Sequence, residues 1–201
     1  MGVSTALYHN LGNAYYRMDE MPRAVLNYER ALLLSPGDAD VRFNLQMARS
    51  KTIDKITPES EMFFVTWYHS LVNMTSVDGW ARMALVALAL AIVLALLYLF
   101  AGTVWLRKVG FFGAFGLIVV FIVANVFAHV QKQSFTSRSG AIIMAPAATV
   151  KSTPAAQGTD LFILHEGTKV NITDGSMRQW KRIRVADGKE GWVETSQIEV
   201  I

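Results

Sequence analysis

The stretch MALVALALAIVLALLYLFAGTVWL, residues 83 to 106, decides the fold together with VGFFGAFGLIVVFIVANVFAHV, residues 109 to 130. Neither run contains an Asp, Glu, Lys or Arg, and 13 residues of the first are Leu, Ile, Val or Phe. At roughly −0.3 to −0.6 kcal/mol each, these side chains favour membrane insertion by about 4 to 8 kcal/mol. At about 1.5 Å per residue, each run can cross roughly 30 Å of hydrocarbon. The two runs predict a membrane hairpin.

The hairpin divides the rest of the chain. We expect a first crossing at 80–106, a tight basic turn at 107–108, a second crossing at 109–130 and a polar tether at 131–139. An even number of crossings places both ends of the chain on one side of the membrane. The alternative is a pair of buried core helices, which would need a large soluble domain around them, whereas the remaining residues form two small pieces of different character.

Basic residues indicate the orientation, because positive charge near the ends of membrane helices favours the cytoplasm. Arg107 and Lys108 form the densest basic site, whereas residues 59 to 78 hold three acidic residues and no Lys or Arg. We therefore expect a cytoplasmic turn and both terminal regions outside. No secretory signal peptide is visible after Met1, which counts against export unless the sequence is a shortened version of a longer protein.

Charge and composition exclude several classes of function. The formal net charge is only +3, and no basic stripe is interleaved with aromatic residues, so we expect no nucleic-acid partner. The chain has no cysteine, which excludes disulfides and thiolate metal sites. The four histidines lie in four different segments, and neither a phosphate-binding Gly-rich loop nor an HExxH pattern is present. We expect no catalytic activity, no cofactor and no metal.

Residues 5 to 38 resemble one tetratricopeptide unit of 34 residues. Small Gly12 and Ala24 allow two antiparallel helices to approach closely, and Pro36 ends the second helix. Residues 39 to 53 read as a further helix with Val41, Leu45 and Ala48 along one side. Residues 1–56 would thus hold one repeat and part of a second, unless they form an unrelated helical hairpin. The positions that match are Tyr8, Leu11, Gly12, Tyr15, Ala24, Tyr28, Ala31 and Pro36.

Such repeats need about three units to bury their hydrophobic faces. We expect the open face here to be covered by upstream residues, another protein, a second copy or the helix before the membrane. Tetratricopeptide repeats usually bind peptides on the face lined by their first helices. Asn13 and Asn44 fall where repeats that grip a C-terminal carboxylate carry asparagine, and His9 replaces the usual lysine. The candidate partner-binding residues are His9, Asn13, Tyr16, Arg17 and Asn44.

Residues 57–79 approach the membrane. Thr57-Pro58-Glu59 is a helix start, with a hydroxyl at the cap, proline at the first helical position and an acid in the first turn. The following apolar residues are too few to span and too hydrophobic for an exposed linker. A helix at 59 to 74 would either lie in the membrane interface, where Trp and Tyr are favoured, or pack under the repeat.

The second crossing carries two features that suggest helix contacts. Four small residues near its start allow a close approach, either within the hairpin or between copies: Gly110, Gly113, Ala114 and Gly116. Asn125 is the only strongly polar side chain inside this segment, and we expect it to make an interhelical hydrogen bond. Because no charge lies in the membrane, a transporter or channel has little support.

The last segment, 140–201, has short β-rich runs separated by turn residues. Asp174-Gly175 and Asp187-Gly188 are hairpin signals, and the whole predicts a small barrel. The expected strands are 141–144, 149–152, 161–164, 169–173, 180–185, 191–194 and 198–201.

The order of these runs resembles a bacterial SH3 domain, although another small barrel is an alternative. Gly167 would serve the turn into the second main strand, and Gly191 would let the backbone pass beside Trp192. Bacterial SH3 domains commonly bind cell-wall or other peptides outside the cytoplasm. The candidate ligand-binding residues are His165, Glu166, Trp180 and Trp192.

The expected fold is therefore a multidomain membrane protein with an all-α tetratricopeptide region, a two-helix transmembrane hairpin and a small all-β SH3-like barrel. This combination resembles the Bat aerotolerance proteins of the BatE type. The matching residues outside the repeat are Asn44-Leu45, Asp54-Lys55-Ile56, Asp78-Gly79-Trp80-Ala81, Ala141-Ile142-Ile143-Met144 and residues 161 to 170.

The resemblance implies a non-enzymatic part of a bacterial inner-membrane complex, encoded with MoxR-type ATPase and von Willebrand A-domain proteins and linked to stress or oxygen tolerance. Two peptide-binding folds at one lipid bilayer suit a scaffold that binds proteins or peptides, and a homo-oligomer is compatible with it. The alternative is a cell-envelope sensor that binds peptidoglycan peptides through the SH3-like domain.

Overall fold

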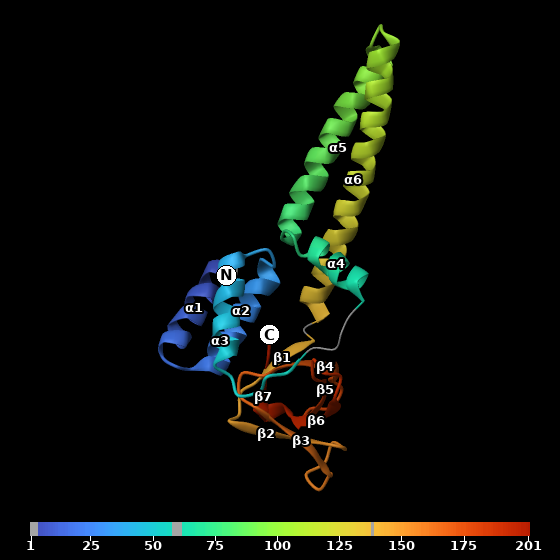
Figure 1. Cartoon of the computed structure of the whole chain (residues 1–201). Helices are drawn as coiled ribbons and strands as arrows, with labels where there is room; N and C mark the ends of the chain where they lie inside the picture. Colours follow the sequence, from blue (N-terminus) through green and yellow to red (C-terminus); the bar gives the residue numbers. More distant parts are fainter. Residues whose placement is uncertain (1–3, 58–61, 138) are drawn as a thin grey trace. The chain divides into compact units, whose positions relative to one another are not determined.

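The computed structural model describes residues 4–57, 62–137 and 139–201. They form two compact units (Figure 1). The terminal unit joins the two ends of the chain, up to Thr66 and from Ser137 onward, and the hairpin unit comprises Trp67–Thr136. The hairpin unit is thus inserted into the sequence of the terminal unit.

The terminal unit begins with three helices, α1 (Thr5–Arg17), α2 (Met21–Leu34) and α3 (Ala39–Ser50). The hydroxyl of Ser4 caps α1 and the carboxylate of Asp38 caps α3 by accepting backbone N–H groups of the first turn. α2 ends two residues before Pro36, as predicted, because proline cannot continue the helix.

Gly12 determines how closely α1 and α2 approach. A Cβ atom at this position would lie 2.5 Å from Cε1 of Tyr28, so only glycine admits the ring. Tyr28 and Ala24 are buried, and the predicted side of α3 is buried against them: Val41, Leu45 and Ala48. The expected close packing of the first two helices is confirmed.

The other end of the chain forms one antiparallel sheet of seven strands in the order β3-β2-β6-β5-β4-β1-β7. All seven predicted strands are present, with ends shifted by a few residues at most. Gly167 (φ +82°) and Gly188 (φ +84°) lie in the turns before β4 and β6, where a positive φ favours glycine. The strands are β1 (Gly140–Ile143), β2 (Ala147–Lys151), β3 (Asp160–His165), β4 (Lys169–Asp174), β5 (Trp180–Arg184), β6 (Glu190–Glu194) and β7 (Ile198–Val200), with a short 3₁₀ helix at Thr195–Gln197.

The sheet is open, whereas the sequence predicted a barrel. Its hydrogen-bonded ladder runs from β3 at one edge to β7 at the other. Within the described residues, no pairing between these two edge strands closes the sheet.

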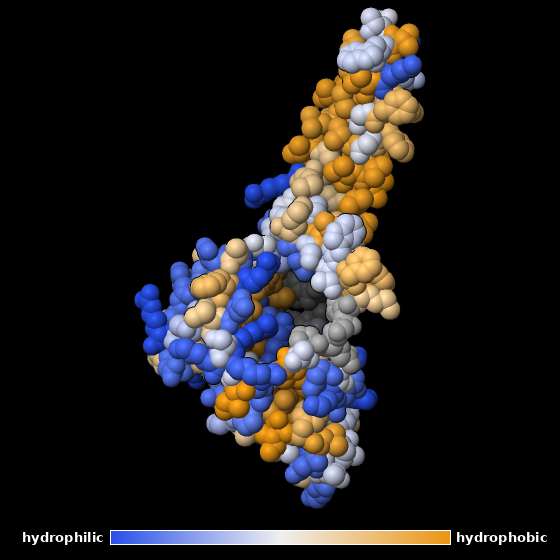
Figure 2. All heavy atoms as spheres, viewed as in Figure 1, coloured by the Kyte–Doolittle hydropathy of each residue, from blue (hydrophilic) through white to orange (hydrophobic). Residues whose placement is uncertain are grey.

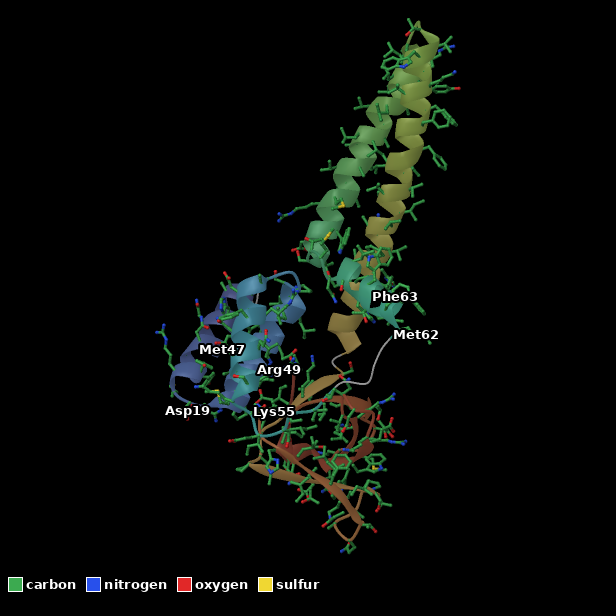
Figure 3. All side chains as sticks on the ribbon, in the orientation of Figure 1. Asp19, Met47, Arg49, Lys55, Met62 and Phe63 are labelled. Atoms are coloured by element: carbon green, nitrogen blue, oxygen red, sulfur yellow. The ribbon has the colours of Figure 1, made fainter. Side chains whose placement is uncertain are left out.

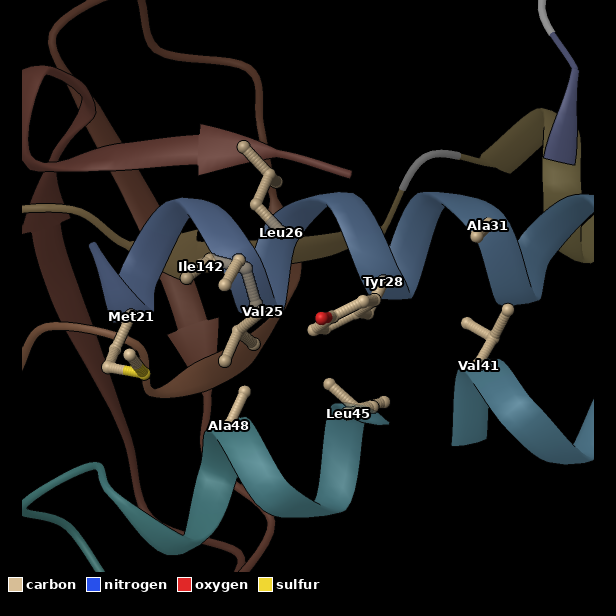
Figure 4. Packing of buried hydrophobic residues seen from close by; sticks show 10 residues of the cluster. Met21, Val25, Leu26, Tyr28, Ala31, Val41, Leu45, Ala48 and Ile142 are labelled. Carbon is tan, nitrogen blue, oxygen red and sulfur yellow. The ribbon is translucent and has the colours of Figure 1, made fainter. Parts of the chain in front are cut away.

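The sheet packs against α2 through one row of residues across three strands. Lys169 on β4, Ile142 on β1 and Glu199 on β7 are direct neighbours in register. Ile142 is fully buried within the helical core, beside Val25 and Leu26 (Figure 4). The row therefore joins helices and sheet into one hydrophobic core.

Ion pairs flank this apolar contact on both sides. Lys169 Nζ lies 2.8 Å from Glu29 Oε2, and Arg30 lies 3.0 Å from Glu199 Oε1. Arg30 also donates to the carbonyl of Val200. Glu29 is nearly fully buried, and it pairs with Arg49 of α3 as well. The opposite charges fix the register of α2 on the sheet.

The hairpin unit consists of α5 (Val77–Phe100) and α6 (Val104–Ser137), with α4 (Phe63–Val72) before them. Both long helices are long and apolar enough to cross a membrane. Only 17% of the apolar window of α5 and 11% of that of α6 are buried, whereas the core helices of a soluble protein would be mostly buried. Figure 2 shows the apolar surface that both helices present.

The turn of the hairpin differs from the prediction. It lies at residues 101–103, and Arg107 and Lys108 belong to the first turns of α6. Gly102 has open space around its Cα, and the side chain of Arg107 donates to the carbonyl of Ala101 at the end of α5. The expected tether at 131–139 is also wrong in its first part, because α6 continues to Ser137.

Small residues bring α5 and α6 together inside the hairpin. A Cβ on Gly110 would lie 2.7 Å from the carbonyl oxygen of Leu94, and a Cβ on Gly113 would lie 2.6 Å from Cδ1 of the same residue. Gly116, by contrast, has open space around it. Of the two interpretations left open by the sequence, the contact within the chain accounts for Gly110 and Gly113.

The helix predicted at 59 to 74 is α4, and Pro58 and Glu59 of its expected start lie outside the described residues. Its end packs on the hairpin, since the carbonyl of Val72 accepts hydrogen bonds from the indole of Trp80 and the amide of Gln131. Phe63 at its start is exposed (Figure 3), and so is Trp67. Exposed aromatic residues are typical of a helix at a membrane interface.

Candidate partner-binding site

Three of the predicted partner-binding residues form one polar cluster between α1 and α3. Asn44 Nδ2 lies 3.0 Å from both the Nε2 of His9 and the Oδ1 of Asn13. The hydroxyl of Tyr28 donates to the same Asn13 oxygen at 2.8 Å. His9, Asn13 and Asn44 are all half-buried. The structure thus brings His9, Asn13 and Asn44 together, across about 35 residues of sequence.

The cluster leaves hydrogen-bond donors unused. Because Nε2 of His9 accepts from Asn44, the ring proton of the neutral imidazole is on Nδ1. The amide nitrogen of Asn13 has no hydrogen-bond partner among the described residues, since its oxygen accepts both bonds. These groups can donate to a carbonyl or carboxylate oxygen of a bound peptide.

Tyr28 supports the cluster from α2. Burial raises the pKa of Tyr28, the nearby Tyr16 adds to the effect, and Arg17 opposes it. The phenol therefore stays protonated at neutral pH and keeps donating to Asn13. This hydrogen bond fixes the orientation of the Asn13 amide, so that its oxygen faces Tyr28 and its nitrogen can bond to a ligand.

The other two predicted residues of this surface, Tyr16 and Arg17, lie further along α1. Lys51 places its ammonium 4.3 Å from the centroid of the Tyr16 ring and lies 3.7 Å from Asp19. Arg17 is exposed in the last turn of the helix. Neither Tyr16 nor Arg17 is hydrogen-bonded to the polar cluster. Tyr16 adds aromatic surface to α1, and Arg17 adds positive charge.

His165 contacts the segment that follows α3. Its backbone N–H donates to Oδ2 of Asp54 at 2.7 Å, and its ring Nδ1 donates to Oδ1 at 2.8 Å. The hydroxyl of Thr168 donates to the same carboxylate at 2.7 Å. Ile56, two residues after Asp54, packs against the hydrophobic core of the sheet. The segment after α3 therefore occupies the loop that the sequence assigned to a ligand.

The remaining predicted ligand residues of the sheet are spread over it. Trp192 pairs with Lys151 at one end of β2, while His165 pairs with Ala147 at the other end. Trp180 is buried beside an open cavity of about 420 Å³ that Arg178 and Glu194 also line. Glu166 is half-buried and has no hydrogen-bond partner within the described ranges. These four residues do not form one site.

Sequence reasoning missed the residues that join helices to sheet, above all Asp54 and Ile142. One signal was available for Ile142: Ala141-Ile142-Ile143-Met144 has no polar residue on either face, which is typical of a strand buried on both sides. Asp54 carries no such signal, because an acid after a helix usually faces water. In the part of the chain that is described, no three His, Asp or Glu residues group as a metal site requires.

We expect Asp54→Asn to weaken the contact between helices and sheet in a pH-dependent way. Burial alone would raise the pKa of Asp54, but the hydrogen bonds from His165 and Thr168 hold it below the ordinary value of 3.8. A lowered folded-state pKa stabilises the protein above about pH 5, and this stabilisation is lost as the pH falls through that pKa. The substitution should lower the free energy of unfolding by about 1–3 kcal/mol at pH 7.

Chemical denaturation of the wild type and of Asp54→Asn between pH 3 and pH 7 measures this difference. It should stay constant above about pH 5 and shrink below it, because the wild-type carboxylate then becomes protonated too. Asp160→Asn, at an exposed ion pair with Lys151, is the matched control and should change stability by less than about 1 kcal/mol. A difference that is constant with pH would contradict the assignment.

No protein-family model matches this chain, and no curated protein matches it.

Proposed function

We propose that this protein is a non-catalytic, membrane-anchored scaffold that binds a peptide segment of a partner protein on the face of α1 and α3. The observation that carries the proposal is the polar cluster of His9, Asn13 and Asn44, whose unused donors point to a peptide carbonyl or carboxylate as ligand. The exposed side chains of Phe43 and Met47 on α3 add apolar surface for a partner.

The anchor is the second part of the proposal. The helices α5 and α6 expose apolar side chains over most of their length, which suits lipid rather than water. The terminal unit contains both ends of the chain, which supports a topology with both ends on one side of the membrane. We place this side in the bacterial periplasm, in a complex of the Bat and MoxR type, on the strength of the sequence resemblance and the basic residues Arg107 and Lys108.

Asn13→Asp tests the peptide-binding face. It keeps the oxygen that accepts from Tyr28 and Asn44, but it replaces the donating amide nitrogen with a second acceptor. We expect recovery of the partner in a pull-down from native membranes, after mild cross-linking, to fall at least tenfold, because a carboxylate repels the ligand oxygen. Quantitative mass spectrometry of the recovered proteins measures the amount of partner.

Asn10→Asp is the matched control, because it makes the same change at an exposed position of α1. It should leave recovery unchanged. Equal recovery with Asn13→Asp and wild type, while both proteins unfold at the same temperature, would contradict binding at the cluster.

Cysteine labelling tests the anchor, since the chain has no native cysteine. Single substitutions Thr5→Cys, Lys108→Cys and Ser176→Cys are treated in intact spheroplasts with a membrane-impermeant maleimide. The first and third should react and the second should not. Reaction of Thr5→Cys and Ser176→Cys from opposite sides would contradict a terminal unit built from both ends.

A second candidate function is a cell-envelope sensor that binds peptidoglycan peptides on the sheet. The cavity beside Trp180, with Arg178 and Glu194 in its wall, favours it, because a peptide with an amine and a carboxylate could pair with both charges. Detergent-solubilised protein should then sediment with purified cell wall, and Trp180→Ala should abolish this. No sedimentation of the wild type would remove the candidate.

A further inference from the structure

Asn125 lies on the outer face of α6, where the hairpin offers it no partner helix. Its amide nitrogen donates to the carbonyl of Phe121 in its own helix at 2.7 Å, and no other hydrogen bond to it exists among the described residues. The neighbouring Ala124 is buried against α5 with Trp80 and Ala84. The expectation of an interhelical bond is therefore not met within the chain, because α5 contacts the adjacent face of α6.

An amide in this position is costly in lipid. The oxygen of Asn125 and its second N–H cannot bond to water inside a bilayer. Polar residues of membrane helices almost always face the interior of a bundle. Here the side chain faces outward from the hairpin, and a helix of another molecule on this face would supply the partner that the hairpin lacks.

Asn125 lies in a stripe of exposed residues along α6. We call this surface the outer seam; its members are exposed and alternate at spacings of three and four residues, namely Phe115, Ile118, Ile122, Asn125 and His129. This spacing is the pattern of helices that pack at about +20°. A single Asn in such a seam specifies register and the number of helices, at some expense of stability.

The geometry points to a second copy of this chain as the occupant of the outer seam. Two copies insert with the same orientation, so their α6 helices run parallel and a two-fold axis brings each residue to its own equivalent. A carboxamide both donates and accepts, so two Asn125 side chains at the same depth satisfy each other. A helix of different sequence would need a polar group at the same depth.

This inference rests on the membrane anchor of the proposed function and adds a homodimer to it. The dimer presents two peptide-binding faces at one membrane, so a partner with two binding segments is held with an increased effective concentration.

Disulfide cross-linking tests the seam, and the absence of native cysteine gives a clean background. Ile122→Cys places one thiol in the seam, while Val123→Cys places it at the same depth but about 100° around the helix. Both positions are exposed, at 54% and 41%. In native membranes treated with a mild oxidant, Ile122→Cys should give a band at twice the 22.3 kDa monomer mass, at least fivefold stronger than Val123→Cys.

Asn125→Leu in the Ile122→Cys background tests the amide pair itself. Cross-linking should fall roughly threefold to tenfold, as expected for one interhelical amide contact in lipid, and Asn125→Gln should restore part of it. Equal cross-linking at positions 122 and 123, a product that contains a different protein, or no effect of Asn125→Leu would each overturn the proposal.

Extraction with alkaline carbonate separates the two hypotheses. If Ile122→Cys does not cross-link while the protein resists extraction, the seam is wrong and the anchor stands. If carbonate releases the protein from the membrane, the anchor itself is wrong and the dimer is wrong with it.

Discussion

Replacement of Ile142 by aspartate should abolish the cooperative folding of both the helices and the sheet. Ile142 belongs to β1 but is fully buried in the core of α1, α2 and α3. Removing it forfeits about 2–3 kcal/mol of apolar burial, and a carboxylate there adds several kcal/mol for the loss of hydration. The sum is comparable to the 5–15 kcal/mol of total stability that is usual for a domain.

Far-UV circular dichroism during thermal unfolding in detergent micelles measures this effect. The variant Ile142→Asp should lose the sheet signal and part of the helical signal in one transition, leaving the signal of α5 and α6. The milder Ile142→Ala should lower the free energy of unfolding by about 2–5 kcal/mol. Ile163→Asp, at a position of β3 that is 56% exposed, should cost less than about 1 kcal/mol. Helices that unfold independently of the sheet would contradict a shared core.

Replacement of Tyr28 by alanine should have the second-largest effect. Its ring is 1% exposed and lies against the Cα of Gly12, so its removal leaves a cavity between α1 and α2. A loss of about 3–5 kcal/mol is expected for a buried aromatic side chain. Because Tyr28 also holds the Asn13 amide, partner recovery should fall even where the protein stays folded.

Tyr28→Phe separates packing from hydrogen bonding. It keeps the ring and removes only the hydroxyl that donates to Asn13. The free energy of unfolding should fall by about 0.5–1.5 kcal/mol, and denaturant titrations of the three proteins measure both losses. If phenylalanine were as destabilising as alanine, the hydroxyl would matter more than the ring, and the packing argument from Gly12 would fail.

Local patterns in the sequence predicted the elements well. Alternating apolar residues and the Asp-Gly pairs marked the strands, and Gly12, Ala24 and Pro36 marked the first two helices. The turn of the hairpin was misplaced because the charges of Arg107 and Lys108 were taken as its position. Gly102 and Thr103, inside an apolar run, end α5 in fact, and the two basic residues are compatible with a helix.

The candidate site was predicted in part. Positions His9, Asn13 and Asn44 follow from the resemblance to a helical repeat, because residues at fixed offsets would share one face. The contact of His165 with Asp54 was not predicted, for a reason that no periodicity reveals. Its partner Asp54 lies 111 residues away along the chain, and such a contact depends on how α3 ends against the sheet.

The insertion of the hairpin between α3 and β1 has a consequence for biosynthesis. The ribosome completes α1 to α3 long before it makes β1 and β7, which cover α2. At roughly 5–20 residues per second, the nascent helices wait on the order of ten seconds with an uncovered apolar flank. In the proposed topology, the hairpin enters the membrane during this interval and returns the growing chain to the side where it started. We expect translation pauses, or chaperones that shield the emerging N-terminal helices, to determine the yield of correctly assembled protein.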